Sequence, residues 1–353
     1  MIYLVSCAVH QTVPDAARVR DMNLEEVYRT ADSQLLAAAA ASALEAAGIN
    51  DPAFRQARAK AIRKTALMDA EMQALFNRLD GAGIWYMPLK GTVVKDYYPV
   101  YGMRQMADRD ILIDAGRATD VRRIMEELGF TTQSFGTGNH DVYFKEPVCN
   151  FEIHRSLFGH VHDPKLRAYY QNVDERLIPC AGQERRFSPE DLYVYVIAHE
   201  YKHYVAGGSG LKSVLDTYVL LRKEALDMRY VAAETEKLGV RSFEERNRSL
   251  ALHLFDGAAL TEEDQKMLAY ILASGTYGTM EHFVENGIAE KGRWKFFLSR
   301  LSLPREVMAS MYPVLKKAPF LYPFFWTYRL VHALLFRRGT VRYQLKAALT
   351  RDK

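Results

Sequence analysis

The chain has 353 residues, 49% of them hydrophobic and 25% charged, and it carries a formal net charge of +4. These ordinary globular values exclude collagen-like, low-complexity and wholly disordered chains, and so weak a positive charge does not favour nucleic acid as the main partner. Three widely spaced cysteines, Cys7, Cys149 and Cys180, form neither a disulfide framework nor a paired metal knuckle. We therefore expect a cytoplasmic protein with about two or three domain-sized units.

The first segment, residues 1–80, is predicted to be helical. An alanine-rich run over 35–44 has high helix propensity. A second helix is expected after Asp51, a capping residue followed by Pro52 at the first helical position, and it continues to Leu79.

A β-rich block is predicted for residues 81–160. Its elements, in chain order, are strands at 84–89 and 110–113, an amphipathic helix at 118–128, and a hairpin of strands at 142–144 and 148–154. One or two helical turns are expected at 92–98, between the first two strands.

Helices are predicted again in residues 161–353. Ser188 and Pro189 have the pattern of a helix start, and a glycine-rich break at 207–210 separates that helix from the next, which begins at Leu211. The fold class is therefore α+β, a small mixed β-sheet with flanking helices, placed between an N-terminal helical segment and a larger C-terminal helical domain.

The C-terminal region combines apolar and basic residues. No uninterrupted run of about 18 apolar residues exists, so a membrane-spanning helix is not expected. The stretch 318–336 contains Pro319, Pro323 and Arg329, and a basic tail follows over 337–353. Aromatic-then-basic helices can make weak peripheral contact with an anionic membrane, although such a segment is more commonly a packed helix with one solvated face.

Three carboxylates indicate a metal-dependent site. Asp108 and Asp110 point the same way if they lie on one strand, because side chains alternate faces. Two close carboxylates repel each other and favour a divalent cation, and oxygen ligands favour Mg²⁺. Glu152 lies on another predicted strand and joins them if the two strands are neighbours. Such a triad holds the metals of phosphoryl transfer.

The order of these motifs resembles that of a known enzyme family. The relevant segments are Leu89-Lys90-Gly91, Arg104-Gln105-Met106-Ala107-Asp108-Arg109-Asp110, Glu152-Ile153-His154, two histidines at His199 and His203, Gly208-Ser209-Gly210, and Leu215-Asp216. Together they are similar to the bacterial uncharacterised nucleotidyltransferase branch of the DNA polymerase beta superfamily. The resemblance spans roughly residues 60 to 225.

The resemblance implies a role for each matching residue. The catalytic carboxylates and Mg²⁺ ligands would be Asp108, Asp110 and Glu152, and the nucleotide would be held by Lys90, Gly91, Thr92, Arg104 and Lys212. The implied reaction moves a nucleoside monophosphate from an NTP, such as ATP, to a hydroxyl of a small molecule or of a protein or peptide, with release of pyrophosphate. Two Mg²⁺ ions and the NTP are the implied cofactor and donor.

Two alternatives stay open. His199-Glu200-Tyr201-Lys202-His203 is a literal His-Glu-x-x-His, so a zinc metalloprotease with Glu200 as general base is one. Lys202 beside a ligand histidine opposes this, and the two histidines already belong to the family pattern. A pseudoenzyme that binds nucleotide without turnover is the other.

Overall fold

The computed structural model describes residues 1–160, 162–276, 278–336 and 338–339. Its α-helices are α1 (Ile2–His10), α2 (Ala16–Arg20), α3 (Leu24–Ser33), α4 (Ala37–Ala46), α5 (Pro52–Gly81), α6 (Gly91–Val94), α7 (Ala118–Glu127), α8 (Pro164–Tyr169), α9 (Pro189–Val205), α10 (Leu211–Lys223), α11 (Met228–Leu238), α12 (Arg241–Asp256), α13 (Glu262–Ser274), α14 (Met280–Lys291), α15 (Arg293–Leu301), α16 (Arg305–Met311), α17 (Val314–Lys317) and α18 (Tyr322–Phe336). The strands are β1 (Tyr86–Pro88), β2 (Arg109–Ile113), β3 (Thr131–Ser134), β4 (His140–Lys145), β5 (Cys149–His154), β6 (Ile178–Pro179) and β7 (Arg185–Arg186).

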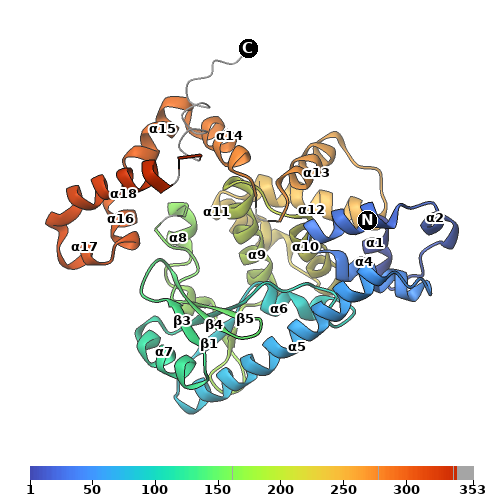
Figure 1. The fold of residues 1–353 in the computed structure, drawn as a ribbon, viewed down its shortest axis with the longest axis horizontal. Helices are drawn as coiled ribbons and strands as arrows, with labels where there is room; N and C mark the ends of the chain where they lie inside the picture. The colour runs from blue at the N-terminus through green and yellow to red at the C-terminus, as the bar shows by residue number, and fades with distance from the viewer. Residues whose placement is uncertain (161, 277, 337, 340–353) are drawn as a thin grey trace.

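A mixed five-stranded sheet has the order β1-β2-β5-β4-β3 (Figure 1). Strand β2 pairs in parallel with β5, and the other neighbouring pairs are antiparallel. The predicted α+β class is therefore confirmed, with a small mixed sheet and many helices.

One face of the sheet packs against helices α5 and α7. Ile111 of β2 and Ile153 of β5 share a buried apolar cluster with Leu75 of α5 and Ile124 of α7. Because side chains alternate along a strand, the polar neighbours of these isoleucines lie on the opposite face. That opposite face is turned toward α9 and α10 and carries the site described below.

A second and larger core joins the N-terminal helices to the C-terminal ones. The alanine-rich α4 packs with α1 and α5, and α1 also contacts α12. Small side chains such as Ala39 and Ala40 are completely buried, which lets neighbouring helices approach closely. The expected helix after Asp51 is confirmed as α5, and the Asp51 carboxylate accepts hydrogen bonds from the backbone N–H groups of Ala53 and Phe54.

Some elements differ from the prediction. Strand β3 has the sequence Thr-Thr-Gln-Ser, which lacks apolar alternation because this edge strand is largely solvent-facing. The short β6–β7 hairpin was also not predicted. Ser188 does cap α9, accepting from the backbone N–H of Asp191 at 3.1 Å.

Helices α15 to α18 form an arm on one side of the molecule (Figure 1). Within the described ranges, no helix is both long and apolar enough to cross a bilayer. The basic tail that was considered for membrane contact lies outside the described residues, apart from Arg338.

Candidate functional site

Two carboxylates face each other across the parallel strands β2 and β5. The register places Asp110 of β2 directly opposite Glu152 of β5. Both point away from the face on which Ile111 and Ile153 pack against α5 and α7. Asp108 comes just before β2, and the same alternation puts it on the side of Asp110. Tertiary structure therefore brings the three predicted acids to one face of the sheet.

Asp110 is buried and has two neutralising neighbours. Its Oδ1 atom accepts hydrogen bonds from Lys90 Nζ at 2.5 Å and from His154 Nε2 at 2.8 Å. Although burial opposes ionisation, the Lys90 ammonium and the His154 hydrogen bond hold the pKa of Asp110 well below its usual range. Asp110 is thus ionised at neutral pH, with one cation already against it.

Lys90 reaches Asp110 from an unusual backbone conformation. Its φ of 48° lies in the left-handed region, which non-glycine residues rarely adopt. The residue stands directly before α6, whose first residue is Gly91. Backbone strain of this kind persists where surrounding contacts hold it, and here the ion pair to Asp110 is such a contact.

Asp108 shows the opposite electrostatic effect. Burial and the nearby negative charges of Asp110 and Glu152 raise the pKa of Asp108 to about 6. A cation bound near these carboxylates would relieve this repulsion. A hard oxygen-ligand set of this kind fits Mg²⁺.

Two histidines, His140 of β4 and His154 of β5, lie beside Glu152. His140 Nε2 lies 3.7 Å and His154 Nε2 lies 3.6 Å from Glu152 Oε2. Among the described residues, these three side chains are the group close enough to hold one metal ion, and Asp108 and Asp110 are not part of that group. His154 Nε2 is, however, within hydrogen-bonding distance of Asp110, while the Asn139 amide faces His154 Nδ1 at 3.5 Å. This network assigns the proton of His154 to Nε2, which makes His154 a donor to Asp110.

Arg104 is held away from free solvent by a buried ion pair. Its Nε and Nη2 atoms donate to the two oxygens of Asp216 on α10 at 2.8 and 2.7 Å, and the Tyr98 hydroxyl donates to the same carboxylate at 2.7 Å. The guanidinium lies over Gly91, where an added Cβ would come within 2.2 Å of Nη1. Arg104 therefore links the sheet block to α10 beneath the cavity.

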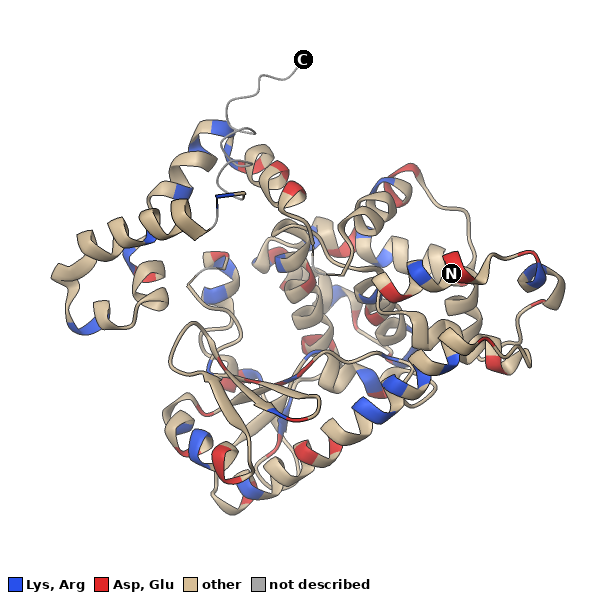
Figure 2. Cartoon of the chain, in the orientation of Figure 1, with Lys and Arg blue, Asp and Glu red and all other residues tan. Residues whose placement is uncertain are grey.

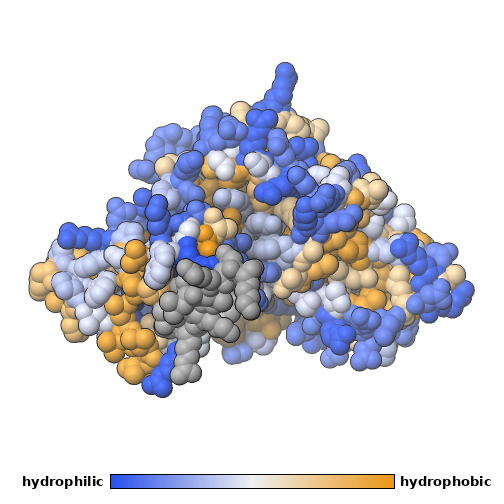
Figure 3. Space-filling model, turned by 90° about the horizontal axis from the view of Figure 1, so that it is seen from above, coloured by the Kyte–Doolittle hydropathy of each residue, from blue (hydrophilic) through white to orange (hydrophobic). Residues whose placement is uncertain are grey.

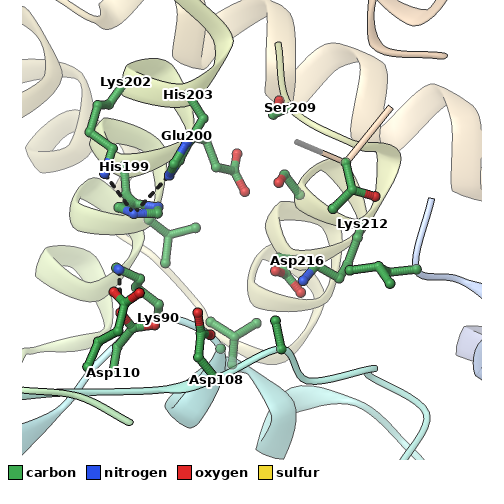
Figure 4. Close-up of a pocket in the computed structure, with 18 of the residues that line it drawn as sticks. Lys90, Asp108, Asp110, His199, Glu200, Lys202, His203, Ser209, Lys212 and Asp216 are labelled. Carbon is green, nitrogen blue, oxygen red and sulfur yellow. Dashed lines mark hydrogen bonds and ion pairs between the residues drawn. The ribbon is translucent and has the colours of Figure 1, made fainter. Parts of the chain in front are cut away.

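A cavity of about 430 Å³ lies between the sheet and helices α9 and α10 (Figure 4). That volume is within the usual range for small-molecule sites. Seven of the eight predicted site residues line it, namely Lys90, Gly91, Arg104, Asp108, Asp110, Glu152 and Lys212. Thr92 is buried behind it, and its hydroxyl accepts from the backbone N–H of Asp110 at 3.2 Å.

Lysines give the wall opposite the carboxylates a positive charge. Lys212 of α10 and Lys202 of α9 both face the cavity (Figure 4). Burial and the neighbouring Arg104 lower the pKa of Lys212 to about 8, and burial and Lys90 lower that of Lys202 to about 8. An anion bound in the cavity would reduce the repulsion between these positive charges and would favour the charged form of both lysines. Carboxylates on one wall and lysines on the other match a bound metal–polyphosphate.

The His-Glu-x-x-His segment lies on α9 with its two histidines close enough to share a metal, but Glu200 and the surrounding ligands differ from those of a zinc protease. His199 Nε2 is 3.2 Å from His203 Nε2 and also 3.2 Å from Lys202 Nζ. The Glu200 carboxylate is buried and accepts hydrogen bonds from Thr217 Oγ1 and Asn247 Nδ2, on α10 and α12. In the part of the chain that the structure describes, no third ligand side chain joins the two histidines.

Sequence reasoning missed residues that only the fold brings to the site. His140 reaches Glu152 because β4 and β5 pair with His140 opposite His154. Lys202 was considered only as an obstacle to zinc, whereas it lines the same cavity as Asp110. His140 lies just before the predicted strand 142–144, so the register of the β4–β5 hairpin decides its place, and Lys202 reaches the cavity because α9 lines it together with the sheet.

Comparison with known proteins decides the family. The profile of one family, described as uncharacterised nucleotidyltransferase, matches residues 20–256, about two thirds of the chain. The chain belongs to this family. A general role in nucleotidyl transfer follows, and the predicted membership is confirmed.

The uncharacterised nucleotidyltransferase match includes the sheet, α9 and α10, and therefore every residue of the cavity's carboxylate and lysine walls. It ends at the last residue of α12, so α13 to α18 lie outside it. Neither the curated proteins nor the solved structures gave a match.

Proposed function

We propose that this nucleotidyltransferase moves a nucleoside monophosphate from an NTP, ATP among them, to a hydroxyl of a small molecule or of a protein or peptide, with release of pyrophosphate. The observation that carries the proposal is the placement of Asp110 opposite Glu152, with Asp108 alongside, on the floor of a lysine-walled cavity. We propose a cytoplasmic reaction, since NTPs are available there.

The three carboxylates would hold Mg²⁺. Their oxygen atoms suit this hard cation, and their mutual repulsion, expressed in the raised pKa of Asp108, favours a divalent charge between them. Bound Mg²⁺ would neutralise developing charge on the transferred phosphoryl group.

The other side chains would position the substrates. His154 donates to Asp110 Oδ1 and so fixes the carboxylate orientation. Lys90 would also contact phosphate oxygens, because its ammonium has three N–H donors and Asp110 takes one of them. Lys212 and Lys202 would neutralise the remaining triphosphate charge, and Glu152 would orient or deprotonate the acceptor hydroxyl.

A second cavity offers a route for the acceptor. It has a volume of about 700 Å³ and lies between α5 and the segment around Asp108. Leu35, Ala107 and Asp108 line both cavities, so the two meet beside the carboxylates. Lys60 and Lys64 line the second cavity, which favours a polar acceptor over an apolar one.

Thermal unfolding with each NTP, with and without Mg²⁺, tests the proposal. We expect a Mg²⁺-dependent rise in Tm with at least one NTP, and loss of that rise in Asp108→Asn/Asp110→Asn. The same double variant should lower pyrophosphate release by several orders of magnitude, because it removes most of the metal-binding charge. Mass spectrometry of added acceptors for a nucleoside monophosphate adduct identifies the acceptor class.

The alternatives give different results. Full transferase activity in the double variant would refute the mechanism. A nucleotide-dependent shift without turnover on any acceptor would favour a pseudoenzyme. A zinc-only shift that disappears in His203→Ala would favour the metalloprotease.

A further inference from the structure

The arm formed by α15 to α18 exposes an unusual amount of apolar surface. In the described part of the chain, eleven of the eighteen exposed large hydrophobic side chains come from residues 294–336. Figure 3 shows hydrophobic side chains gathered at the end of the molecule where Figure 1 places α16 to α18. Contiguous exposed apolar patches mark interaction sites in soluble proteins. This arm lies outside the family match, which ends at residue 256.

Helix α18 has its apolar side outward. Phe324, Tyr328, Val331 and Leu335 follow the spacing of one helix face, and each is exposed. The opposite face is attached to the arm, where Trp326 Nε1 donates to the backbone oxygen of Leu301 at 3.0 Å. None of the fifteen residues of α18 is buried. A surface helix normally turns its apolar face toward the core and its polar face toward solvent. The exposed apolar face of α18 therefore indicates a binding surface for an apolar partner.

Basic residues flank this apolar helix in the sequence. Lys316 and Lys317 precede Phe320, which is 79% exposed, and Arg338 follows Phe336, which is 74% exposed. Residues 292–353 contain thirteen Lys and Arg but only two acidic residues, Glu306 and Asp352. The rest of the chain is net negative, because the total is only +4. Figure 2 shows the same separation along α15 to α18.

We propose that the α15–α18 arm docks on an anionic lipid bilayer. Apolar side chains flanked by lysine and arginine suit a helix that lies in the interface, with its aromatic side chains among the acyl chains and its cations at the headgroups. Helix α18 has fifteen residues, so at about 1.5 Å per residue it is too short to cross the roughly 30 Å hydrocarbon core. The high positive charge favours a lipid surface over a second copy of the arm, because two such arms would repel each other.

Vesicle co-sedimentation of the full chain tests the docking. We expect binding to vesicles that contain phosphatidylglycerol, weak binding to pure phosphatidylcholine, and release by salt. The emission of Trp294, which is 64% exposed on the arm, should shift to the blue on binding. Absence of binding to the anionic vesicles at low salt would overturn the proposal.

Three sets of variants locate the contact. Phe324→Ser/Val331→Ser/Leu335→Ser should abolish binding without affecting folding, because all three side chains are already exposed. Lys316→Glu/Lys317→Glu should lower the partition coefficient at least about 25-fold, since each lost basic residue near an anionic surface costs about fivefold and the added glutamates repel the surface. The matched control Val13→Ser/Leu67→Ser/Ile178→Ser removes exposed apolar groups from the rest of the molecule and should bind as the unmodified chain does.

Other occupants of the face give distinct outcomes. A concentration-dependent dimer that the Phe324/Val331/Leu335 variant abolishes, together with no vesicle binding, would assign the face to a second copy and overturn the proposal. A third outcome is that the Phe324/Val331/Leu335 variant binds vesicles as the unmodified chain does, while a chain ending at Gly339 no longer binds. This result would place the contact after residue 339 and would also overturn the proposal. None of these variants touches the nucleotide cavity, so failure here leaves the proposed transferase untouched.

Discussion

At the scale of single residues, the site depends on how neighbouring charges set protonation. Asp110 and Asp108 are two residues apart, yet Lys90 and His154 keep Asp110 ionised while burial and two acidic neighbours raise the pKa of Asp108. Glu200 shows a third situation. It is buried among Thr217, Asn247 and the negative charge of Asp216, and its pKa is raised well above the ordinary range by burial first and by Asp216 next.

Glu200→Gln tests both the raised pKa of Glu200 and the protease alternative. Because the folded pKa of Glu200 is above its unfolded value, its contribution to stability is full below the unfolded pKa and is lost as pH rises through the folded pKa. Gln cannot ionise, so the Tm of Glu200→Gln relative to the unmodified chain should rise by a few degrees between pH 5 and pH 8. Equal effects at both pH values would mean that Glu200 is ionised in the folded protein. The variant should keep its Mg²⁺- and NTP-dependent shift, whereas a protease would lose its general base.

At the scale of elements, the turn into α6 depends on the absence of a side chain at one position. A Cβ on Gly91 would lie 2.2 Å from Nη1 and 2.7 Å from Cζ of Arg104. Arg104 cannot move aside easily, because Asp216 holds it at two atoms. Gly91 therefore has a packing role beside its expected role in phosphate binding.

Gly91→Ala should destabilise the protein by about 1–3 kcal/mol, the usual effect of overpacking. Gly81→Ala is a suitable control, since Gly81 is the last residue of α5 and nothing lies within 4 Å of its added Cβ. Alanine there should be neutral or stabilising by roughly 0.5–1 kcal/mol. Urea unfolding of both variants measures the difference in their free energies of unfolding. Equal free energies would show that the Arg104 side chain shifts to make room for the added Cβ.

At the scale of the whole molecule, one buried ion pair joins the sheet block to the C-terminal helices. Arg104 and Asp216 are 112 positions apart, and both are largely buried. Removing one partner of a buried pair leaves an uncompensated charge, which costs more than the net stabilisation by the intact pair. The relative position of the cavity's two walls depends on this contact.

Asp216→Ala should lower the free energy of unfolding by about 3–5 kcal/mol. The exposed pair of Lys266 with Glu262 provides the control, because its side chains are 72% and 82% exposed, and Lys266→Ala should cost less than about 1 kcal/mol. Chemical denaturation of the two variants gives both values. Similar losses in the two would contradict a structural role for the Arg104–Asp216 pair.

The sequence alone predicted several helix starts, the shared side of Asp108 and Asp110, and the family of this protein. Helix propensity and capping placed α5 after Asp51 and α9 after Ser188, because those preferences act within a few residues along the chain. Strand alternation put Asp108 and Asp110 on one side, and the ordered motifs led to the family. The division of the chain at residues 80 and 160, and the role of each site residue, stay predictions.

Only the tertiary structure decided which distant groups meet. The parallel pairing of β2 with β5 brings Glu152 opposite Asp110, and the pairing of β4 with β5 adds His140. The fold also brings Asn247 of α12 to the Glu200 carboxylate. The contacts of β2 with β5 and of α9 with α12 depend on packing between segments far apart in sequence, and the place of His140 depends on the register of the predicted hairpin.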